Sequence, residues 1–495
     1  MAPVKGSGLR VLFVNGLLGG DFSALDIGVT VLASWLNQKT RHRAAIADLV
    51  FHSRHWQRHL HREIERKRPD VIALSCNTMY MKYVRRIVAE VRRRHTLPIV
   101  LGGHHASIEP AEVFALPGVD AVVIGDGELP LQGYLDRLSE GGNFEGVPGL
   151  WVRERGPLGR EVRNEGGAFL EDIDQLPYLE WDLWDDLDRY FYFLGMIYAQ
   201  GSRGCPYRCT FCDAQGYARA LRGTGSYFRL RDPEAFVAEL EHYYHRYHHR
   251  GARLFQLFDP VFTMDDDWLT RFSAEYRRRG LHERMRYSAF SRIDHLSEEK
   301  VALLARSGCA LLRVGIEAGD DHIRMEVYKK KIGSATIRRI FAAAKRQGLD
   351  FTAFFIFGGP QETHTSFFKT TRLAWELDAA RSGFFVYKPF TAEGRAQIEA
   401  AGGGIDSVRY AAADNIAWGG ATSGKGWGPR SLEAWQLAAY GLTFGRRWVR
   451  MIRRRGLPAY TTALARYMAR GLRLGLDWRY MAMYFHIYEG DNVDQ

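Results

Sequence analysis

Three cysteines lie close together in the segment SRGCPYRCTFCDAQ, as Cys205, Cys209 and Cys212. Thiolates are the protein ligands of iron–sulfur clusters, and three of them on one short loop can bind three irons of a [4Fe-4S] cubane. The fourth iron then lacks a protein ligand, so the amino and carboxylate groups of a small molecule can chelate it. The spacing C-x3-C-x2-C therefore predicts a cluster with one open iron.

Structural zinc is the main alternative for these cysteines, because soft thiolates also bind that metal. Zinc would normally take a fourth Cys or His ligand at a recognisable spacing, and the usual second CxxC pair is missing. The two other cysteines, Cys76 and Cys309, stand singly in apolar stretches, which is not the pattern of a disulfide framework. Zinc binding and unreactive structural cysteines stay open as weaker interpretations.

The cysteine segment follows the first of six apolar runs that alternate with helical segments between residue 196 and about residue 387. Asp232 before Pro233 and Ser297 before EEKVALLAR have the composition of helix starts, and Gly308 and Gly348 that of helix ends. This βα alternation predicts a partial (β/α)6 barrel with the cysteines on the loop after its first strand. The expected strands are MIYAQ, RLFQLF, MRYSAF, LLRVGI, FTAFFIF and GFFVY.

A similar alternation from Leu9 to about Leu138 predicts a separate α/β domain with a parallel sheet. Small residues follow the expected strands LRVLFV, RAAIADL, DVIALS, PIVLGG and DAVVIG. Ligands of open α/β sheets bind at the carboxyl edge of the strands, where backbones must come close. A dinucleotide site would need G-x-G-x-x-G after the first strand, and FVNGLLGGDFSALD lacks that spacing. Cobalamin, which needs a wide edge for its corrin ring, fits better.

Composition is that of a soluble globular protein, with 46% hydrophobic and 25% charged residues over 495 positions. We predict an α/β fold with a Rossmann-like domain at 1–140, a connector at 141–190, the barrel at 191–392 and a mostly helical domain at 393–495. No uncharged run approaches the roughly 20 apolar residues of a membrane-spanning helix, and no signal-peptide core is visible. A cytoplasmic location is expected.

Much of the formal net charge of +11 lies near the C-terminus. The segment that begins RRWVRMIRRR could line an anionic substrate site or lie on a membrane surface. We favour a helical domain that caps the barrel and keeps its arginines in water. No nucleic-acid partner is expected, and peripheral membrane contact stays open.

The cysteine spacing, with the aromatic Phe211 before the last cysteine, resembles the signature of the radical S-adenosylmethionine (SAM) superfamily. The likeness extends across nearly the whole chain to the cobalamin-binding class of that superfamily. GGHHAS with the following VDAVVIGDGE, then GCPYRCTFC, RID, GIEAG and FFIFGGPQET, occur in that family's order and spacing. The resemblance implies three cofactors, namely a [4Fe-4S] cluster, SAM and cobalamin.

By position, the resemblance assigns the residues around SAM. Arg292 of SRID and Glu317 of GIEAG are expected to hold its carboxylate and ribose, while the backbone beside Phe211 and the turn at Gly358 flank the adenine. Asp259 of LFDPVF is expected to point towards the reaction centre. For each residue alone, a structural ion pair or a simple turn is the competing interpretation.

The resemblance also implies cobalamin contacts in the first domain. The D-x-H-x-x-G motif, which supplies a histidine to cobalt in other cobalamin enzymes, is absent, so the lower axial ligand is undecided. His104 and His105 could ligate cobalt or line the corrin, although loop histidines bonded to backbone are commoner. The expected contacts are Gly16, Leu17, Ser75, Thr78, Gly102, Gly103, His105, Gly125, Gly127 and Glu128.

The resemblance implies an enzyme that cleaves SAM reductively to a 5'-deoxyadenosyl radical and methylates an unactivated carbon through methylcobalamin. Its expected partners are a small-molecule or peptide substrate and an electron donor of the flavodoxin or ferredoxin type. One alternative keeps the cofactors for cyclisation, rearrangement or oxidation without methylation. A second alternative, a non-enzymatic Fe-S or zinc protein that binds nucleic acid, leaves RID, GIEAG and the first domain unexplained.

Overall fold

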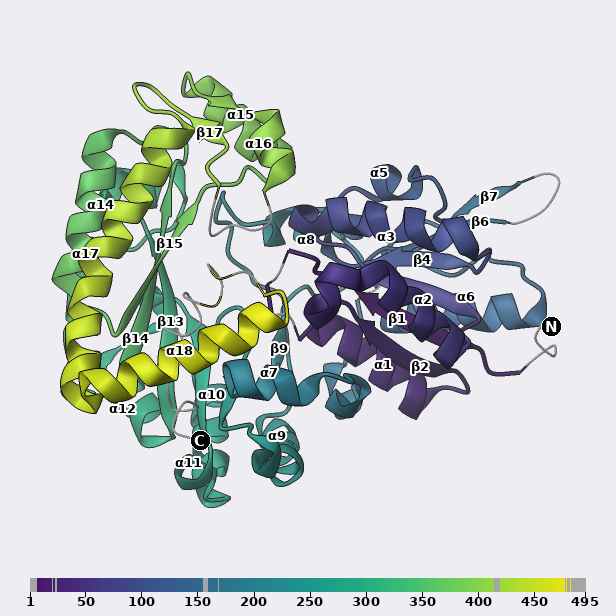
Figure 1. Ribbon diagram of the computed structural model, residues 1–495, viewed down its shortest axis with the longest axis horizontal. Helices are drawn as coiled ribbons and strands as arrows, with labels where there is room; N and C mark the ends of the chain where they lie inside the picture. The colour runs from purple at the N-terminus through teal and green to yellow at the C-terminus, as the bar shows by residue number, and fades with distance from the viewer. Residues whose placement is uncertain are drawn as a thin grey trace. The chain divides into compact units, whose positions relative to one another are not determined.

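The computed structural model describes residues 7–19, 21–22, 25–154, 159–167, 169–413, 419–476, 478 and 481. The chain divides into two compact units, each with its own sheet (Figure 1). The first unit contains the described residues up to Leu194, Gly216–Arg229 and those from Tyr467 onward. The second contains Gly195–Gln215 and Leu230–Arg466.

The first unit is built on a sheet whose five leading strands are parallel, in the order β2-β1-β3-β4-β5. The strands are β1 (Arg10–Asn15), β2 (Arg43–Asp48), β3 (Val71–Ser75), β4 (Ile99–Gly102) and β5 (Ala121–Val123). They coincide with the apolar runs of the sequence. Strands β1, β3 and β5 are buried on both faces, as parallel strands require, whereas the first half of the edge strand β2 is exposed or half-buried. The predicted α/β fold with a parallel N-terminal sheet is confirmed.

Helices cover both faces of this sheet. They are α1 (Ile27–Lys39), α2 (Trp56–Lys67), α3 (Met81–Arg94), α4 (His104–Ile108), α5 (Pro110–Phe114) and α6 (Glu128–Glu140). Apolar residues of α2, α3, α4 and α5 share one core cluster with the strands. On the other face α1 packs beside α6, and Trp35 donates its indole N–H to Gln132 Oε1 at 3.0 Å.

The expected connector, residues 141–190, is more structured than predicted. Its first half forms β6 (Leu150–Arg153) and β7 (Glu161–Arg163), an antiparallel pair that extends the first sheet beyond β5. Its second half packs on α1, since Trp184 donates its indole N–H to Thr30 Oγ1 at 2.9 Å. It leads into α7 (Leu187–Leu194). The predicted connector therefore belongs to the first unit, while the other domain boundaries remain predictions.

The second unit contains the six-stranded barrel sheet, in the order β15-β14-β13-β12-β11-β8, with every pair parallel. Each strand falls on one of the six predicted runs: β8 (Met196–Ala199), β11 (Leu254–Leu257), β12 (Arg286–Ser291), β13 (Cys309–Glu317), β14 (Asp350–Phe357) and β15 (Arg381–Val386). Short strands β9 (Ser202–Arg203) and β10 (Arg229–Leu230) pair with each other. Because the six strands are parallel and consecutive strands are neighbours, all six carboxyl ends meet at one edge.

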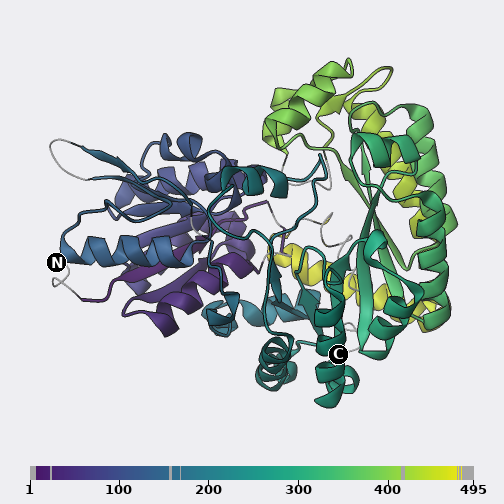
Figure 2. The same cartoon turned by 180° about the vertical axis from the view of Figure 1, so that it is seen from behind.

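Helices between these strands cover the outside of the barrel, as Figure 2 shows from behind. They are α9 (Pro233–Tyr247), α10 (Asp266–Arg278), α11 (Leu281–Arg284), α12 (Glu298–Arg306), α13 (Ser334–Gln347) and α14 (His364–Leu377); α8 (Ala214–Ala220) follows the cysteines. Of the helix ends proposed from sequence, Asp232 and Ser297 accept backbone N–H bonds, and Gly348 takes the left-handed C-cap. Gly308, with a φ of 92°, lies one residue beyond Ser307, the C-cap of α12.

The C-terminal part is mostly helical, as predicted. It comprises α15 (Ala392–Ala400), β16 (Gly404–Ile405), α16 (Ser407–Ala412), β17 (Thr422–Ser423), α17 (Pro429–Arg455) and α18 (Leu457–Arg473). Gln436 of α17 donates its side-chain amide to Phe384 O at 2.6 Å, which fixes the helix beside strand β15. Within the described residues, no helix is both long and apolar enough to cross a membrane.

Candidate functional site

The three cysteines lie on the loop that follows β8, at the carboxyl edge of the barrel sheet. Cys209 is buried, and Cys205 and Cys212 are half-buried. Burial raises the pKa of Cys212 to about 12 and also raises that of Cys205, so these sulfurs keep their protons unless a cation accompanies them. In the described part of the chain, no three His, Cys, Asp or Glu side chains converge as for a single metal ion.

Asp259, two residues after β11, holds the start of the cysteine loop. Its Oδ1 accepts the backbone N–H of Gly201 at 3.0 Å and the hydroxyl of Ser202 at 2.6 Å. Burial raises the pKa of Asp259 to about 6. The residue predicted to face the reaction centre therefore also positions the loop that carries the cysteines.

The end of the cysteine loop is fixed on η7 (Ile323–Val327), a single π-helical turn beyond β13. Thr210 donates its hydroxyl to Val327 O at 2.9 Å and its backbone N–H to Tyr328 O at 3.3 Å. The Phe211 ring packs edge-on against the Tyr328 ring at 5.3 Å between centroids. Single π-helical turns often occur at functional sites.

Arg292, which follows β12, contacts the cysteine loop directly. Its Nη1 donates to Cys209 Sγ at 3.2 Å, and its other nitrogens form a bidentate pair with Asp294 at 2.8 and 3.0 Å. The guanidinium also stacks on the Tyr207 ring at 3.6 Å. Arg292 thus brings a fixed positive charge to a sulfur where a cluster would add negative charge.

Glu317 ends β13 at a β-bulge opposite β14 and has a left-handed φ of 69°. Such a conformation is uncommon for a residue other than glycine and often marks a functional site. Its Oε1 accepts a hydrogen bond from Lys330 Nζ at 2.7 Å, and both side chains are buried. Lys330 was missed by sequence reasoning, because it stands in the run YKKKIG, which is typical of a solvated surface.

Gly358 and Gly359 form the turn after β14. Both backbone N–H groups donate to one carboxylate oxygen of Glu362, at 2.7 and 2.9 Å, and Gly358 has a φ of 87°. Glu362 is fully buried, which raises its pKa to about 8. Glu362 lies in the motif FFIFGGPQET, and sequence alone predicts no role for it.

Several buried polar atoms around this edge lack a hydrogen-bond partner among the described residues. They are Asp259 Oδ2, Glu362 Oε1 and the hydroxyl oxygens of Tyr328 and Tyr387. Buried polar groups are rarely left unpaired in native proteins, so such atoms commonly meet a ligand or water. Together with the three thiols, they fit a [4Fe-4S] cluster and a polar small molecule bound beside it.

The first unit has the strand order 2-1-3-4-5, in which chain direction across the sheet reverses between β1 and β3. Ligands of such sheets bind at this switch point, outside the carboxyl ends of the strands. Gly16 and Leu17 follow β1, Ser75 ends β3 and Thr78 follows it, so they border the switch point. All four are exposed or half-buried, which leaves the edge accessible.

Glycines after β4 let neighbouring backbones approach closely. A Cβ on Gly103, whose φ is 98°, would lie 2.9 Å from Cys76 O and from Ser75 Oγ. Gly102 precedes it at the end of β4, and Gly125 donates its backbone N–H to Ser107 Oγ at 2.9 Å. Gly127 and Glu128 start α6. This edge, lined by small residues, fits the flat corrin of cobalamin.

His105 lies inside the first unit rather than at its surface. Its ring is buried, its Nδ1 lies 3.1 Å from Thr78 Oγ1, and its Nε2 lies 3.6 Å from Glu112 Oε1. Burial lowers its pKa, so the ring is held neutral. His104 is exposed and stacks on Tyr217 at 4.7 Å. The structure thus gives His105 a positioning role for Thr78.

Asp126, between the predicted positions Gly125 and Gly127, is a further residue that sequence reasoning missed. Its Oδ2 accepts from Arg229 Nη1 at 2.6 Å and from Leu170 N at 3.1 Å. Both partners are distant in sequence, so only the folded chain reveals this link. Asp126 anchors the segment Gly216–Arg229, which follows the cysteines, within the first unit.

Two separate parts of the chain match known protein families. Residues 19–135 match the family model of the B12 binding domain, and residues 200–374 match that of the radical SAM superfamily. A protein named as an uncharacterised methyltransferase of Pyrococcus horikoshii is 28% identical over 331 residues, which are 65% of this chain and 67% of that protein.

A second relative is the anaerobic magnesium-protoporphyrin IX monomethyl ester cyclase of Cereibacter sphaeroides, 25% identical over 362 residues. The match covers 70% of this chain and 55% of the cyclase, so the chain spans between about half and two thirds of these relatives.

Among solved structures, the radical SAM methyltransferase TsrM of Kitasatospora setae, with tryptophan and a SAM analogue bound, has a TM-score of 0.65 at 22% identity. The superposition covers 80% of this chain and 76% of TsrM, and it shows the same fold.

Proposed function

The chain belongs to the cobalamin-dependent radical SAM enzymes, and we propose that it transfers a methyl group from SAM to an unactivated carbon of a small-molecule or peptide substrate. The observation that carries the proposal is the order of its parts. A B12 binding domain at 19–135 precedes a radical SAM domain at 200–374, whose first loop holds the three cysteines.

When bound, the [4Fe-4S] cluster supplies the electron that cleaves SAM to methionine and a 5'-deoxyadenosyl radical, and cobalamin carries the methyl group to carbon. In this proposal Cys205, Cys209 and Cys212 hold the cluster. Asp259 fixes the loop from one side, and Arg292 offsets negative charge at Cys209.

SAM would lie at the carboxyl edge of β12, β13 and β14. Glu317, held by Lys330, is positioned to accept hydrogen bonds from the ribose hydroxyls. The turn at Gly358 and Gly359 is held by Glu362, and it would face the adenine together with the backbone beside Phe211. Each of these groups is fixed by a second buried residue, which is the pre-organisation that radical chemistry requires.

Cobalamin would lie on the carboxyl edge of the first sheet. Gly102, Gly103 and Gly125 place no side chain at this edge, and Ser75 and Thr78 offer hydroxyl groups beside the switch point. Because the His105 ring is buried inside the first unit, we assign it no bond to cobalt.

The test is an anaerobic reconstitution with iron, sulfide and hydroxocobalamin, followed by reaction with methyl-deuterated SAM and a reductant of the flavodoxin type. Candidate substrates are ranked by how far they accelerate 5'-deoxyadenosine formation. Transfer of the deuterated methyl group to a carbon of the product supports the proposal. No SAM cleavage with any reductant, in a sample that holds both cofactors, contradicts it.

A second candidate function uses the same cofactors for cyclisation, rearrangement or oxidation without methyl transfer. The similarity to the magnesium-protoporphyrin IX monomethyl ester cyclase is the observation that favours it. It predicts 5'-deoxyadenosine and a modified substrate that carries no deuterium. We also propose a cytoplasmic location, where reductants for such clusters are present.

A further inference from the structure

Helix α17 exposes a continuous apolar face. Between residues 434 and 449, every position that the structure describes as exposed is Ala, Gly, Leu or Val, and together these positions cover about 140° of the helix at 100° per residue. Leu437 is 61% exposed, Leu442 51% and Val449 49%. The face consists of Ala434, Leu437, Ala438, Gly441, Leu442, Gly445 and Val449.

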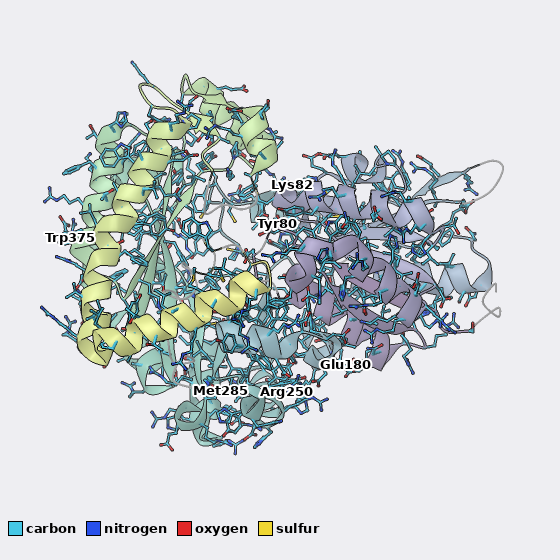
Figure 3. All side chains as sticks on the ribbon, viewed as in Figure 1. Tyr80, Lys82, Glu180, Arg250, Met285 and Trp375 are labelled. Atoms are coloured by element: carbon cyan, nitrogen blue, oxygen red, sulfur yellow. The ribbon has the colours of Figure 1, made fainter. Side chains whose placement is uncertain are left out.

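Helix α14 continues this apolar surface. The two helices lie side by side, and Trp435 of α17 donates its indole N–H to His364 Nδ1 of α14 at 2.8 Å. Phe368 and Trp375 of α14 are exposed, and Arg446 of α17 stacks on the Trp375 ring at 3.2 Å. Figure 3 shows Trp375 at the outer rim of the second unit, beside both helices. We call the seven exposed apolar positions of α17, together with Phe368 and Trp375 of α14, the α17 face.

Exposed apolar side chains are concentrated in this part of the chain. Of the eleven large hydrophobic residues exposed among the described residues, six lie between 437 and 478, and two more are Phe368 and Trp375. An exposed apolar surface of this kind on a folded protein indicates an interaction site.

Positive charge is concentrated in α17 and in the helix that follows it, α18. Helices α17 and α18 together contain ten arginines and one glutamate, a net charge of +9 within a chain whose total is +11. Arg430 and Arg453 are exposed at the two ends of the α17 face, and neither has an ion-pair partner within the described part of the chain. An apolar helix face bordered by exposed arginines is the composition of helices that lie in the interface of an anionic bilayer.

We propose that the α17 face docks the protein on the surface of an anionic lipid bilayer. The positive charge of these helices argues against a second copy of the protein as the binding partner, because two α17 faces would bring like charges together. The positive charge favours a negatively charged partner. The partner must also have an apolar part in which the exposed apolar side chains can be buried. An anionic membrane surface offers both, and a helix of this composition lies on the bilayer rather than across it.

The test is flotation of the reconstituted 495-residue chain with vesicles of three parts phosphatidylcholine to one part phosphatidylglycerol, at low and high salt. The protein should float with these vesicles and should dissociate from them as the salt concentration rises. It should not bind vesicles of phosphatidylcholine alone. Because flotation measures no catalysis, its outcome is independent of the proposed methyl transfer.

Substitutions on the α17 face give the decisive comparison. Leu442→Asp should lower vesicle binding about tenfold, because it removes apolar contact and adds a charge repelled by the lipid. Arg453→Glu should lower binding at least about fivefold, since each basic residue near an anionic surface contributes about 1 kcal/mol. Val408→Asp is the matched control, because Val408 is 77% exposed but lies on α16, outside the α17 face.

Three results would overturn the proposal. The first is that the protein does not float with anionic vesicles. The second is that Leu442→Asp and Val408→Asp bind vesicles equally well. The third is that Leu442→Asp leaves vesicle binding unchanged but abolishes a dimer in sedimentation equilibrium or the capture of an acidic flavodoxin. Circular dichroism and SAM cleavage by each variant establish that it is folded.

Discussion

Replacing Lys330 by methionine tests how the proposed SAM site is held together. Lys330 Nζ lies 2.7 Å from Glu317 Oε1, and both side chains are more than nine-tenths buried. Removing one partner of a buried ion pair leaves an uncompensated charge, which costs about 3–5 kcal/mol. Methionine retains most of the apolar volume, so little of this loss should come from a cavity.

The effect should also reach the cysteine loop. Lys330 donates its backbone N–H to Arg324 O at 3.0 Å, within the segment that begins with η7, and this segment supplies the carbonyl groups of Val327 and Tyr328 to Thr210. Without the ion pair that anchors this segment, the end of the loop loses its support. We expect Lys330→Met to lower both stability and the iron content after reconstitution.

The assay is equilibrium urea unfolding of the reduced apoprotein, together with iron analysis and SAM binding. The control is the double variant Glu317→Gln with Lys330→Met, in which no buried charge is left unpaired. It should recover most of the lost stability and iron, but not SAM binding, since the glutamine side chain ends in a neutral amide rather than a carboxylate. Equal instability of single and double variants would refute the reasoning, because the loss would then come from packing rather than from charge.

Cys212→Ala should lose the cluster and SAM cleavage, whereas Cys309→Ala, at a buried cysteine in β13, should keep its iron; native SAM cleavage by Cys212→Ala would contradict the assigned role. Burial raises the pKa of Glu362 from 4.5 to about 8, so its contribution to stability is fully present below about pH 4.5 and is lost as pH rises through about 8. When unfolding is measured at a series of pH values, Glu362→Gln should not show this loss of stability. A pH profile equal to that of the wild type would contradict the prediction. Gly103→Ala should cost about 1–3 kcal/mol and reduce cobalamin retained on gel filtration, because alanine strains a φ of 98°. Gly333→Ala, where a Cβ meets open space, is its control and should retain cobalamin.

The barrel and its cysteine loop could be predicted from sequence because their signals are local. Six apolar runs, each of the length of a strand, coincide with β8, β11, β12, β13, β14 and β15. A buried parallel strand must be apolar on both faces, so it can be recognised without knowledge of its partners. The cysteine spacing is equally local, since one loop supplies all three thiols.

The hairpin of β6 and β7 could not be predicted in the same way. Its strands have four and three residues with alternating burial, which is too short for a periodic pattern. They become strands only because β5 offers β6 a free edge. Such pairing is decided by a neighbour that is distant in sequence.

By itself, the sequence determined the order of the strands along the chain, the three cysteines and the likeness to cobalamin-binding radical SAM proteins. Only the tertiary structure decided which polar groups meet. It paired Lys330 with Glu317, placed Arg292 on Cys209 and turned His105 inward to Thr78. The physical reason is that a charged group in water needs no particular partner, whereas a buried charged group is stable only beside a partner that compensates its lost hydration. That partner is set by packing between strands, which residue spacing along the chain does not record.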